Sequence, residues 1–176
     1  TRPSVGYHIL ALVTIAVWGT TFVSTKVLLS HGLTPPEIMF YRFIIAYALT
    51  WIFTRKVWAD TWKDELLLAL AGFTGGTLYF LAENTALDYS ITSNVALVVC
   101  VTPVLTALLT SLCYKERITA RLVVGSVVAL SGVGFVVLNG TVLKIHPLGD
   151  ALALVAAVAW AVYSVVIRRF DGCYTT

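Results

Sequence analysis

Residues 11–18 read ALVTIAVW and residues 153–160 read ALVAAVAW, and these two related stretches decide the interpretation of the fold. They align when the sequence is shifted by 142 residues, and the same shift places Val23 on Val165 and Lys26 on Arg168. Both stretches are apolar and both end in a tryptophan. They predict that one helical unit near the start of the chain occurs again near its end.

Apolar stretches of this kind extend along the whole chain. Of its 176 residues, 59% are hydrophobic and 12% are charged, whereas a soluble domain has about 25% charged residues. A segment in lipid must satisfy its own backbone hydrogen bonds, so apolar runs of about 20 residues are expected to be membrane helices. We predict an all-α integral membrane protein with six transmembrane helices, at residues 7–29, 38–53, 66–87, 91–112, 122–138 and 148–167.

The basic residues fall mainly on one side of this predicted topology. Nine of the twelve Lys and Arg residues lie on that side, Lys144 lies on the other side, and Lys26 and Arg42 lie within spans. Cytoplasmic loops are enriched in Lys and Arg. We therefore expect a multi-pass membrane protein with a cytoplasmic N-terminus. The nine residues are Arg2, Arg55, Lys56, Lys63, Lys115, Arg117, Arg121, Arg168 and Arg169.

The first and sixth spans cross the membrane in opposite directions in this topology. A repeat unit of five spans must invert because five is odd. Inverted repeats are common in secondary transporters, whose solute site lies near the midplane where the halves meet. We predict a five-helix inverted repeat bundle, with the first repeat over residues 1–142 and the first helix of the second repeat over residues 143–176. Six helices of ten would then be present in this sequence.

Charged residues inside the predicted spans form the first group of candidate site residues. Lys26, Arg42 and Glu83 are expected at a similar depth, roughly 5–8 Å from the outer ends of their helices at 1.5 Å per residue. One interpretation makes Glu83 a proton or substrate-amine site that the two cations tune. The alternative is a buried charge network that only fixes the helices.

Aromatic and polar residues form the second group. Those of the first and sixth spans lie on faces that would meet if the two repeats face each other, while Tyr79 and Glu83 share a face of the third span and Asn94 lies on the fourth. Aromatic walls with a few hydroxyls suit a small organic solute. Packing alone is an alternative explanation for each tryptophan. The expected substrate-binding residues are Trp18, Thr21, Tyr79, Glu83, Asn94, Trp160 and Tyr163.

An ordered set of motifs runs through the chain. It comprises Trp18-Gly19, Phe22, Lys26, Pro35-Pro36, Arg42-Phe43, Thr85-Ala86-Leu87, Asn94, Pro103, Thr106-Ala107-Leu108-Leu109, Glu116-Arg117-Ile118-Thr119, Gly125, Gly132–Gly134, Gly149-Asp150, Trp160 and Tyr163. Together these motifs resemble the EamA domain of the drug/metabolite transporter superfamily over essentially the whole chain. The resemblance implies a ten-helix inner-membrane carrier that exports amino acids or related metabolites by alternating access.

Two functions remain open from the sequence. One is a secondary transporter that exports small organic metabolites, and the other is a non-transporting membrane scaffold or helix-assembly partner. A pocket between the first, third, fourth and sixth spans would favour the transporter. The expected partners are a small-molecule substrate, the lipid bilayer, protons as coupling ion, and an absent C-terminal repeat or a dimer partner.

Other classes of protein find little support in the sequence. It has no zinc-protease signature, phosphate loop or paired aspartates, so we expect neither catalytic residues nor an enzyme. No metal site and no cofactor are expected. Nucleic acid is not an expected partner, because no basic patch with interleaved aromatics is present.

Overall fold

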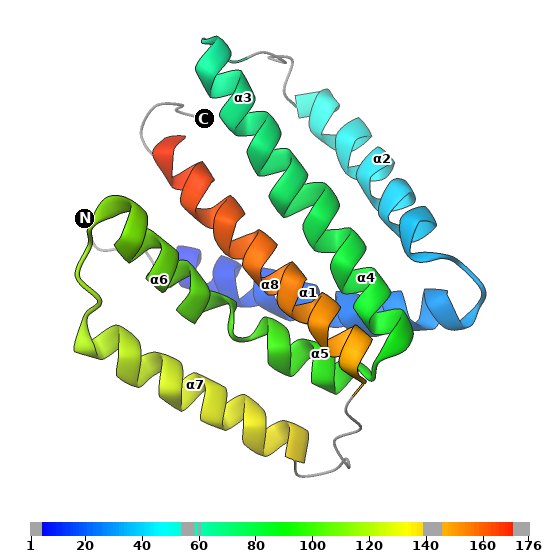
Figure 1. The fold of residues 1–176 in the computed structure, drawn as a ribbon. Helices are drawn as coiled ribbons and strands as arrows, with labels where there is room; N and C mark the ends of the chain where they lie inside the picture. The colour runs from blue at the N-terminus through cyan, green and yellow to red at the C-terminus, as the bar shows by residue number, and fades with distance from the viewer. Residues whose placement is uncertain (1–4, 54–58, 60, 139–145, 171–176) are drawn as a thin grey trace.

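The chain is described by a computed structural model that covers residues 5–53, 59, 61–138 and 146–170. Within these ranges the chain forms helices and short connections, and it contains no strand (Figure 1). The predicted all-α class is therefore confirmed. Arg2, Arg55, Lys56, Lys144 and the predicted boundary between residues 142 and 143 lie outside the described residues.

The first two helices are α1 (Val5–Ser30) and α2 (Pro35–Phe53). Gly32 has a φ of 93° in the turn between them, a conformation that glycine adopts at little cost. The backbone N–H and the hydroxyl of Thr34 both donate to the Glu37 carboxylate, at 2.8 and 2.7 Å. These bonds hold the pKa of Glu37 below its ordinary value and fix the start of α2.

The third predicted span is a single rod of three parts. It consists of α3 (Trp62–Ala71), η1 (Gly72–Leu78) and α4 (Tyr79–Tyr89), which together are 28 residues long. The middle part, η1, is a π-helix, a wider turn that is rare and often lies at functional sites. Because a π-helix has more residues per turn than an α-helix, η1 shifts the direction in which Tyr79 and the residues after it point around the helix axis.

The fourth predicted span is divided into α5 (Thr92–Val99) and α6 (Thr102–Tyr114). Pro103 has no N–H, so the carbonyl of Val99 cannot receive the usual helical bond from it. The hydroxyl of Thr102 donates to this carbonyl instead, at 2.6 Å. The sequence predicts one span over residues 91–112, and the structure has a 23-residue candidate span at Thr92–Tyr114 that is divided near its middle, where the proline starts a new helix.

The last helices are α7 (Ala120–Leu138), α8 (Pro147–Ile167) and the 3₁₀ turn η2 (Arg168–Phe170). Helix α7 lies at the edge of the molecule beside α5 and α6. Helix α8 lies at the centre, where it packs against α3, η1, α4, α5 and α6 (Figure 1). The helix assigned to the second repeat is thus the central helix of the described bundle.

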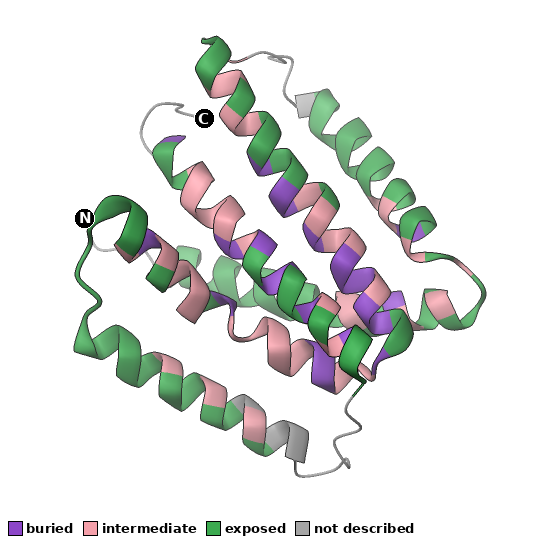
Figure 2. Ribbon diagram, in the orientation of Figure 1, coloured by how far each residue is buried: buried purple, intermediate pink, exposed green. Residues whose placement is uncertain are grey.

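Burial is concentrated where α8 meets α4 (Figure 2). Small side chains on α8 let the backbones of the two helices come close, as in many membrane bundles. Two close approaches are marked by glycine: a Cβ on Gly75 would lie 2.5 Å from Cδ2 of Tyr163, and a Cβ on Gly149 would lie 2.7 Å from Cβ of Ser90. The buried alanines of α8 are Ala153, Ala156, Ala157, Ala159 and Ala161.

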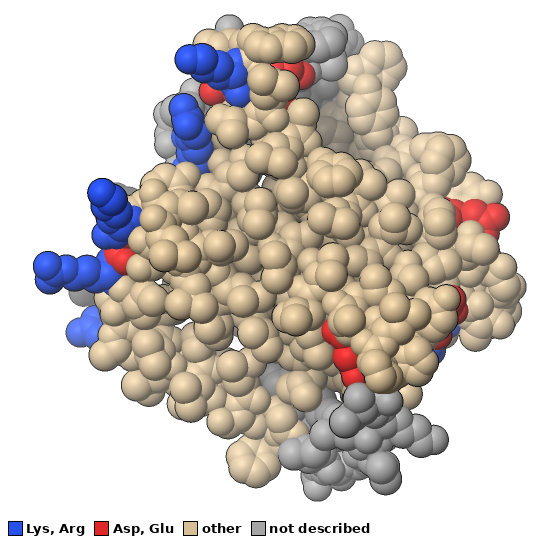
Figure 3. Space-filling view, in the orientation of Figure 1, with Lys and Arg blue, Asp and Glu red and all other residues tan. Residues whose placement is uncertain are grey.

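Four helical segments of the described chain are long and apolar enough to cross a membrane. They are Val5–Ser30, Trp62–Tyr89, Thr92–Tyr114 and Pro147–Phe170, with a shorter apolar helix at Ala120–Gly132. Four of the six predicted spans are thereby supported, while spanning by α2 and α7 stays a prediction. On the face shown in Figure 3, most of the visible Lys and Arg side chains gather along one edge of the molecule.

The contact between Gly75 and Tyr163 predicts the effect of a single methyl group. Gly75→Ala should destabilise the protein by about 1–3 kcal/mol, because the new Cβ overlaps the ring of Tyr163. Thermal unfolding in detergent would measure the change. Gly72→Ala is the matched control in the same π-helix: a Cβ there meets nothing within 4 Å, so stability should stay unchanged or rise slightly. Equal effects of the two substitutions would contradict the close approach.

Candidate functional site

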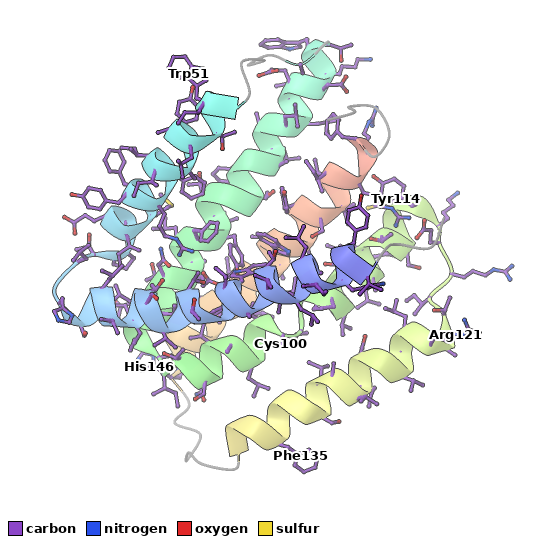
Figure 4. The ribbon with its side chains drawn as sticks, turned by 180° about the vertical axis from the view of Figure 1, so that it is seen from behind. Trp51, Cys100, Tyr114, Arg121, Phe135 and His146 are labelled. Atoms are coloured by element: carbon purple, nitrogen blue, oxygen red, sulfur yellow. The ribbon has the colours of Figure 1, made fainter. Side chains whose placement is uncertain are left out.

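A cavity of about 1100 Å³ lies between α1, α4, α5, α6 and α8. Its volume is somewhat above the usual range for sites that bind small molecules. The cavity lies beside α5, α6 and the break between them, where Cys100 is one of the lining residues (Figure 4). This position corresponds to the first, third, fourth and sixth predicted spans.

One wall of the cavity is aromatic and comes from α1, α4 and α8. The rings of Trp18 and Trp160 lie 5.2 Å apart between centroids, and those of Tyr79 and Trp160 lie 4.8 Å apart. All three residues line the cavity. Trp18 and Trp160 are the two tryptophans that the internal sequence match aligns, so related positions of the two stretches meet at this site.

The opposite wall comes from α5 and α6 and carries hydroxyl groups among small side chains. These groups can exchange hydrogen bonds with a solute, while the aromatic wall offers apolar area. The lining hydroxyl residues are Thr92, Ser93, Thr102, Thr106, Thr110 and Ser111.

At one end of the cavity, a cluster of contacts joins α6 and the residues that follow it to the end of α8 and to η2. The Arg168 guanidinium forms a two-point ion pair with Glu116, with N···O distances of 2.9 and 2.5 Å. It also lies 5.5 Å from the ring centroid of Tyr114, whose hydroxyl donates to the carbonyl of Val165 at 3.0 Å. Glu116, Arg117 and Arg168 are the charged residues among those that line the cavity.

A buried polar cluster lies behind the aromatic wall. The hydroxyl of Tyr79 donates to Oε1 of Glu83, one turn further along α4. Arg42 of α2 acts electrostatically on Glu83, and its guanidinium lies 4.9 Å from the ring centroid of Phe80. Glu83 and Arg42, two members of the predicted charge network, are therefore near each other, but Glu83 is not one of the residues that line the cavity.

Lys26, the third member of that network, makes its contacts elsewhere. Its ammonium donates to the carbonyl of Leu87 and, at 3.0 Å, to that of Ser90. These carbonyls belong to the C-terminal end of α4, where a cation is favourable. Lys26 thus fastens α1 to the turn between α4 and α5.

The remaining predicted site residues occupy different positions. The Thr21 hydroxyl donates to the carbonyl of Trp18 at 2.7 Å within α1. Asn94 is buried on α5, and Tyr163 packs against Gly75 and contacts the Trp160 ring at 5.1 Å. Of the seven predicted substrate-binding residues, Trp18, Tyr79 and Trp160 line the cavity.

Sequence reasoning did not select Glu116 and Arg168 as site residues. The sequence places Glu116 in a family motif and Arg168 among the basic residues and opposite Lys26 in the internal match, but their pairing across 52 positions has no sequence signature. The hydroxyls of α6 had a weak signal, since Thr102, Thr106 and Thr110 recur every four residues on one helix face. The described residues contain no group of three or more His, Cys, Asp or Glu that is suited to a metal ion.

A bundle of apolar membrane helices around a cavity of this size is typical of membrane transport proteins. Comparison with known families identifies the chain more closely. The EamA-like transporter family matches residues 6–138, and the chain belongs to this family.

Several curated relatives are similar over most of the chain. An uncharacterized transporter of Archaeoglobus fulgidus is 29% identical over 165 residues, which are 90% of this chain and 56% of the relative. An uncharacterized transporter of Bacillus subtilis is 30% identical over 168 residues, 88% of this chain and 53% of the relative. A probable terminal-alkyne amino-acid exporter of Streptantibioticus cattleyicolor is 25% identical over 168 residues. The alignment covers 93% of this chain and 55% of the relative.

The chain spans about half the length of these relatives. No solved structure matches it significantly.

The ion pair between Glu116 and Arg168 predicts how Cys100 is reached from water. In a variant with Cys113 and Cys173 replaced by serine, Glu116→Gln should make charged methanethiosulfonates label Cys100 up to about fivefold faster. A half-exposed pair contributes at most about 1 kcal/mol, and its loss is expected to widen access at this end of the cavity. Labelling of the detergent-solubilised protein, followed by mass spectrometry, measures the rate.

Two reagents of opposite charge separate opening from electrostatics. An opened end speeds the anionic and the cationic reagent alike, whereas a mere change of local charge speeds one and slows the other. Unchanged rates with both reagents would mean that the ion pair does not close the cavity.

Proposed function

We propose that this chain forms part of a secondary transporter that exports small organic metabolites, such as amino acids or related compounds, by alternating access. The observation that carries the proposal is the cavity whose wall contains Trp18 and Trp160, the aligned tryptophans of the two related stretches. Membership of the EamA-like transporter family supports the same conclusion.

The position of the cavity favours a transporter over a scaffold. A scaffold that only binds neighbouring helices would be sealed by apolar contacts throughout. Here a solute-sized space lies between the helices of the first, third, fourth and sixth predicted spans. The scaffold remains the alternative function, and solute transport tests the two against each other.

The proposed architecture is a five-helix inverted repeat, with residues 1–142 as the first repeat and residues 143–176 as the beginning of the second. The central position of α8 supports it, since the first helix of one half would be in contact with the other half at the solute site. The gathering of Lys and Arg along one edge supports the proposed inner-membrane topology with a cytoplasmic N-terminus (Figure 3).

The lining of the cavity suggests the kind of solute. Aromatic rings on one wall and hydroxyls on the other suit a small molecule with an apolar body and a few hydrogen-bonding groups. The terminal-alkyne amino-acid exporter of Streptantibioticus cattleyicolor, 25% identical to the chain, is named for a solute of this kind. Protons are the proposed coupling ion, with Glu83 as their binding group.

Solute flux in vesicles that contain the full-length protein tests the proposed function. Amino acids, nucleosides and amphiphilic cations form the screening set. Saturable flux of at least one of them is expected. A complete lack of saturable flux across the set would favour the scaffold.

The aromatic wall predicts how Trp160→Ala changes this flux. We expect KM to rise roughly 2- to 10-fold, because an aromatic contact contributes about 0.5–1.5 kcal/mol. Trp51→Ala is the matched control, since Trp51 is 62% exposed on α2, away from the cavity, and its loss should leave KM unchanged. Equal KM values in both variants would remove Trp160 from the solute site.

A further inference from the structure

Tyr79 separates Glu83 from the solute cavity. Both side chains are buried, with Tyr79 1% and Glu83 2% exposed. Tyr79 lines the cavity and its ring packs against Trp160, while its hydroxyl donates to Glu83, which does not line the cavity. A single side chain therefore contacts both the proposed solute site and the buried carboxyl group.

Few polar or charged groups other than Tyr79 lie near Glu83 on the neighbouring helices. Arg42 of α2 acts electrostatically on the carboxylate, and its Nη1 is buried without a hydrogen-bond partner. Helix α8 packs on this part of α4 through Ala156 and Ala159, which have no polar group in their side chains. Helix α5, Thr92–Val99, contains no titratable residue.

The remaining charged groups near α4 lie at its C-terminal end. Lys26 of α1 donates to the carbonyls of Leu87 and Ser90. Asp150 of α8 accepts a bond from the Ser90 hydroxyl at 3.2 Å, and His146 precedes it at the start of the same helix. Among the groups named, Tyr79 is hydrogen-bonded to Glu83 and Arg42 acts on it electrostatically.

The protonation state of Glu83 changes the strength of the hydrogen bond that Tyr79 donates to it. A hydrogen bond from a hydroxyl to an ionised carboxylate is about twice as strong as one between neutral groups. When a proton from the aqueous phase binds the carboxylate, the bond from Tyr79 weakens, and the phenol is released toward the cavity. When the proton leaves, the phenol is held back again.

We propose that Tyr79 is the positioning residue that transmits the protonation of Glu83 to the solute cavity, so that Glu83 acts without touching the solute. The inference rests on the proposed transport function, which it deepens by naming how proton binding reaches the solute site. Trp160 is the first cavity residue to respond, because its ring lies against that of Tyr79.

A pH titration of Trp160 fluorescence tests the proposal without any transported solute. The probe is the full-length protein in lipid vesicles, with every tryptophan other than Trp160 replaced by phenylalanine, including the other four of this chain. We expect the fluorescence of Trp160 to change with pH. Glu83→Gln should abolish the change, and Tyr79→Phe should abolish it as well although Glu83 is present.

Infrared spectroscopy of the carboxylic acid band shows whether Glu83 still binds its proton. In Tyr79→Phe the band of Glu83 should still appear as pH falls, although Trp160 no longer responds. Tyr163→Phe is the matched control, since Tyr163 also contacts the Trp160 ring, at 5.1 Å, and its loss should leave the pH response intact.

Three results would overturn the proposal. The first is a Trp160 signal that does not depend on pH, or that persists in Glu83→Gln. The second is a pH response that survives Tyr79→Phe but not Glu83→Gln, which would mean that Glu83 acts on the cavity directly. The third is loss of the Glu83 band itself in Tyr79→Phe. Absence of solute flux would sink the proposed function instead, and it leaves these readings unaffected.

Discussion

The close packing of α8 on α4 is the contact on which the rest of the described structure depends. Lipid provides no hydrophobic driving force between helices, so membrane helices associate through tight packing and hydrogen bonds. Alanines on α8 and Gly75 on η1 allow the two backbones to come close, and they leave space for the rings of Tyr79 and Trp160 further along the interface. The aromatic wall of the cavity exists because this interface has both small and large residues.

The charged side chains described above lie away from the middle of the cavity. Lys26 lies at the end of α4, Arg168 and Glu116 lie at the end of α8 and α6, and Glu83 lies behind Tyr79. Each of these groups has a partner that is reached without crossing the cavity. The middle of the cavity is left to rings, methyl groups and hydroxyls, which can hold a solute by weak contacts and release it again.

The helices and the aromatic pair could be predicted from the sequence because they depend on local and repeated patterns. Apolar runs place the membrane helices within a few residues, and the match of Trp18 with Trp160 points to the two rings that meet at 5.2 Å. The π-helix at Gly72–Leu78 could not be predicted, since no residue pattern in the sequence marks its wider turn. The pairing of Glu116 with Arg168 is equally invisible in sequence, because it depends on where two helices end in space.

The contacts of Lys26 show a second kind of interaction that the sequence does not predict. Its position within a span suggests a partner of opposite charge, and Glu83 is a carboxylate at a similar expected depth. The ammonium instead donates to two backbone carbonyls at the end of α4, because a helix terminus offers unpaired acceptors that no sequence pattern marks. Every residue carries the same backbone carbonyl, so the residue types of the sequence do not show which carbonyls are left unpaired.

The break between α5 and α6 has a mechanical consequence for the bundle. The carbonyl of Val99 has already exchanged its helical donor for the hydroxyl of Thr102, and both residues border the cavity. Bending the chain at this joint therefore disturbs fewer regular backbone bonds than bending a continuous helix. The two halves of this segment can tilt relative to each other as rigid levers, with the joint beside whatever occupies the cavity.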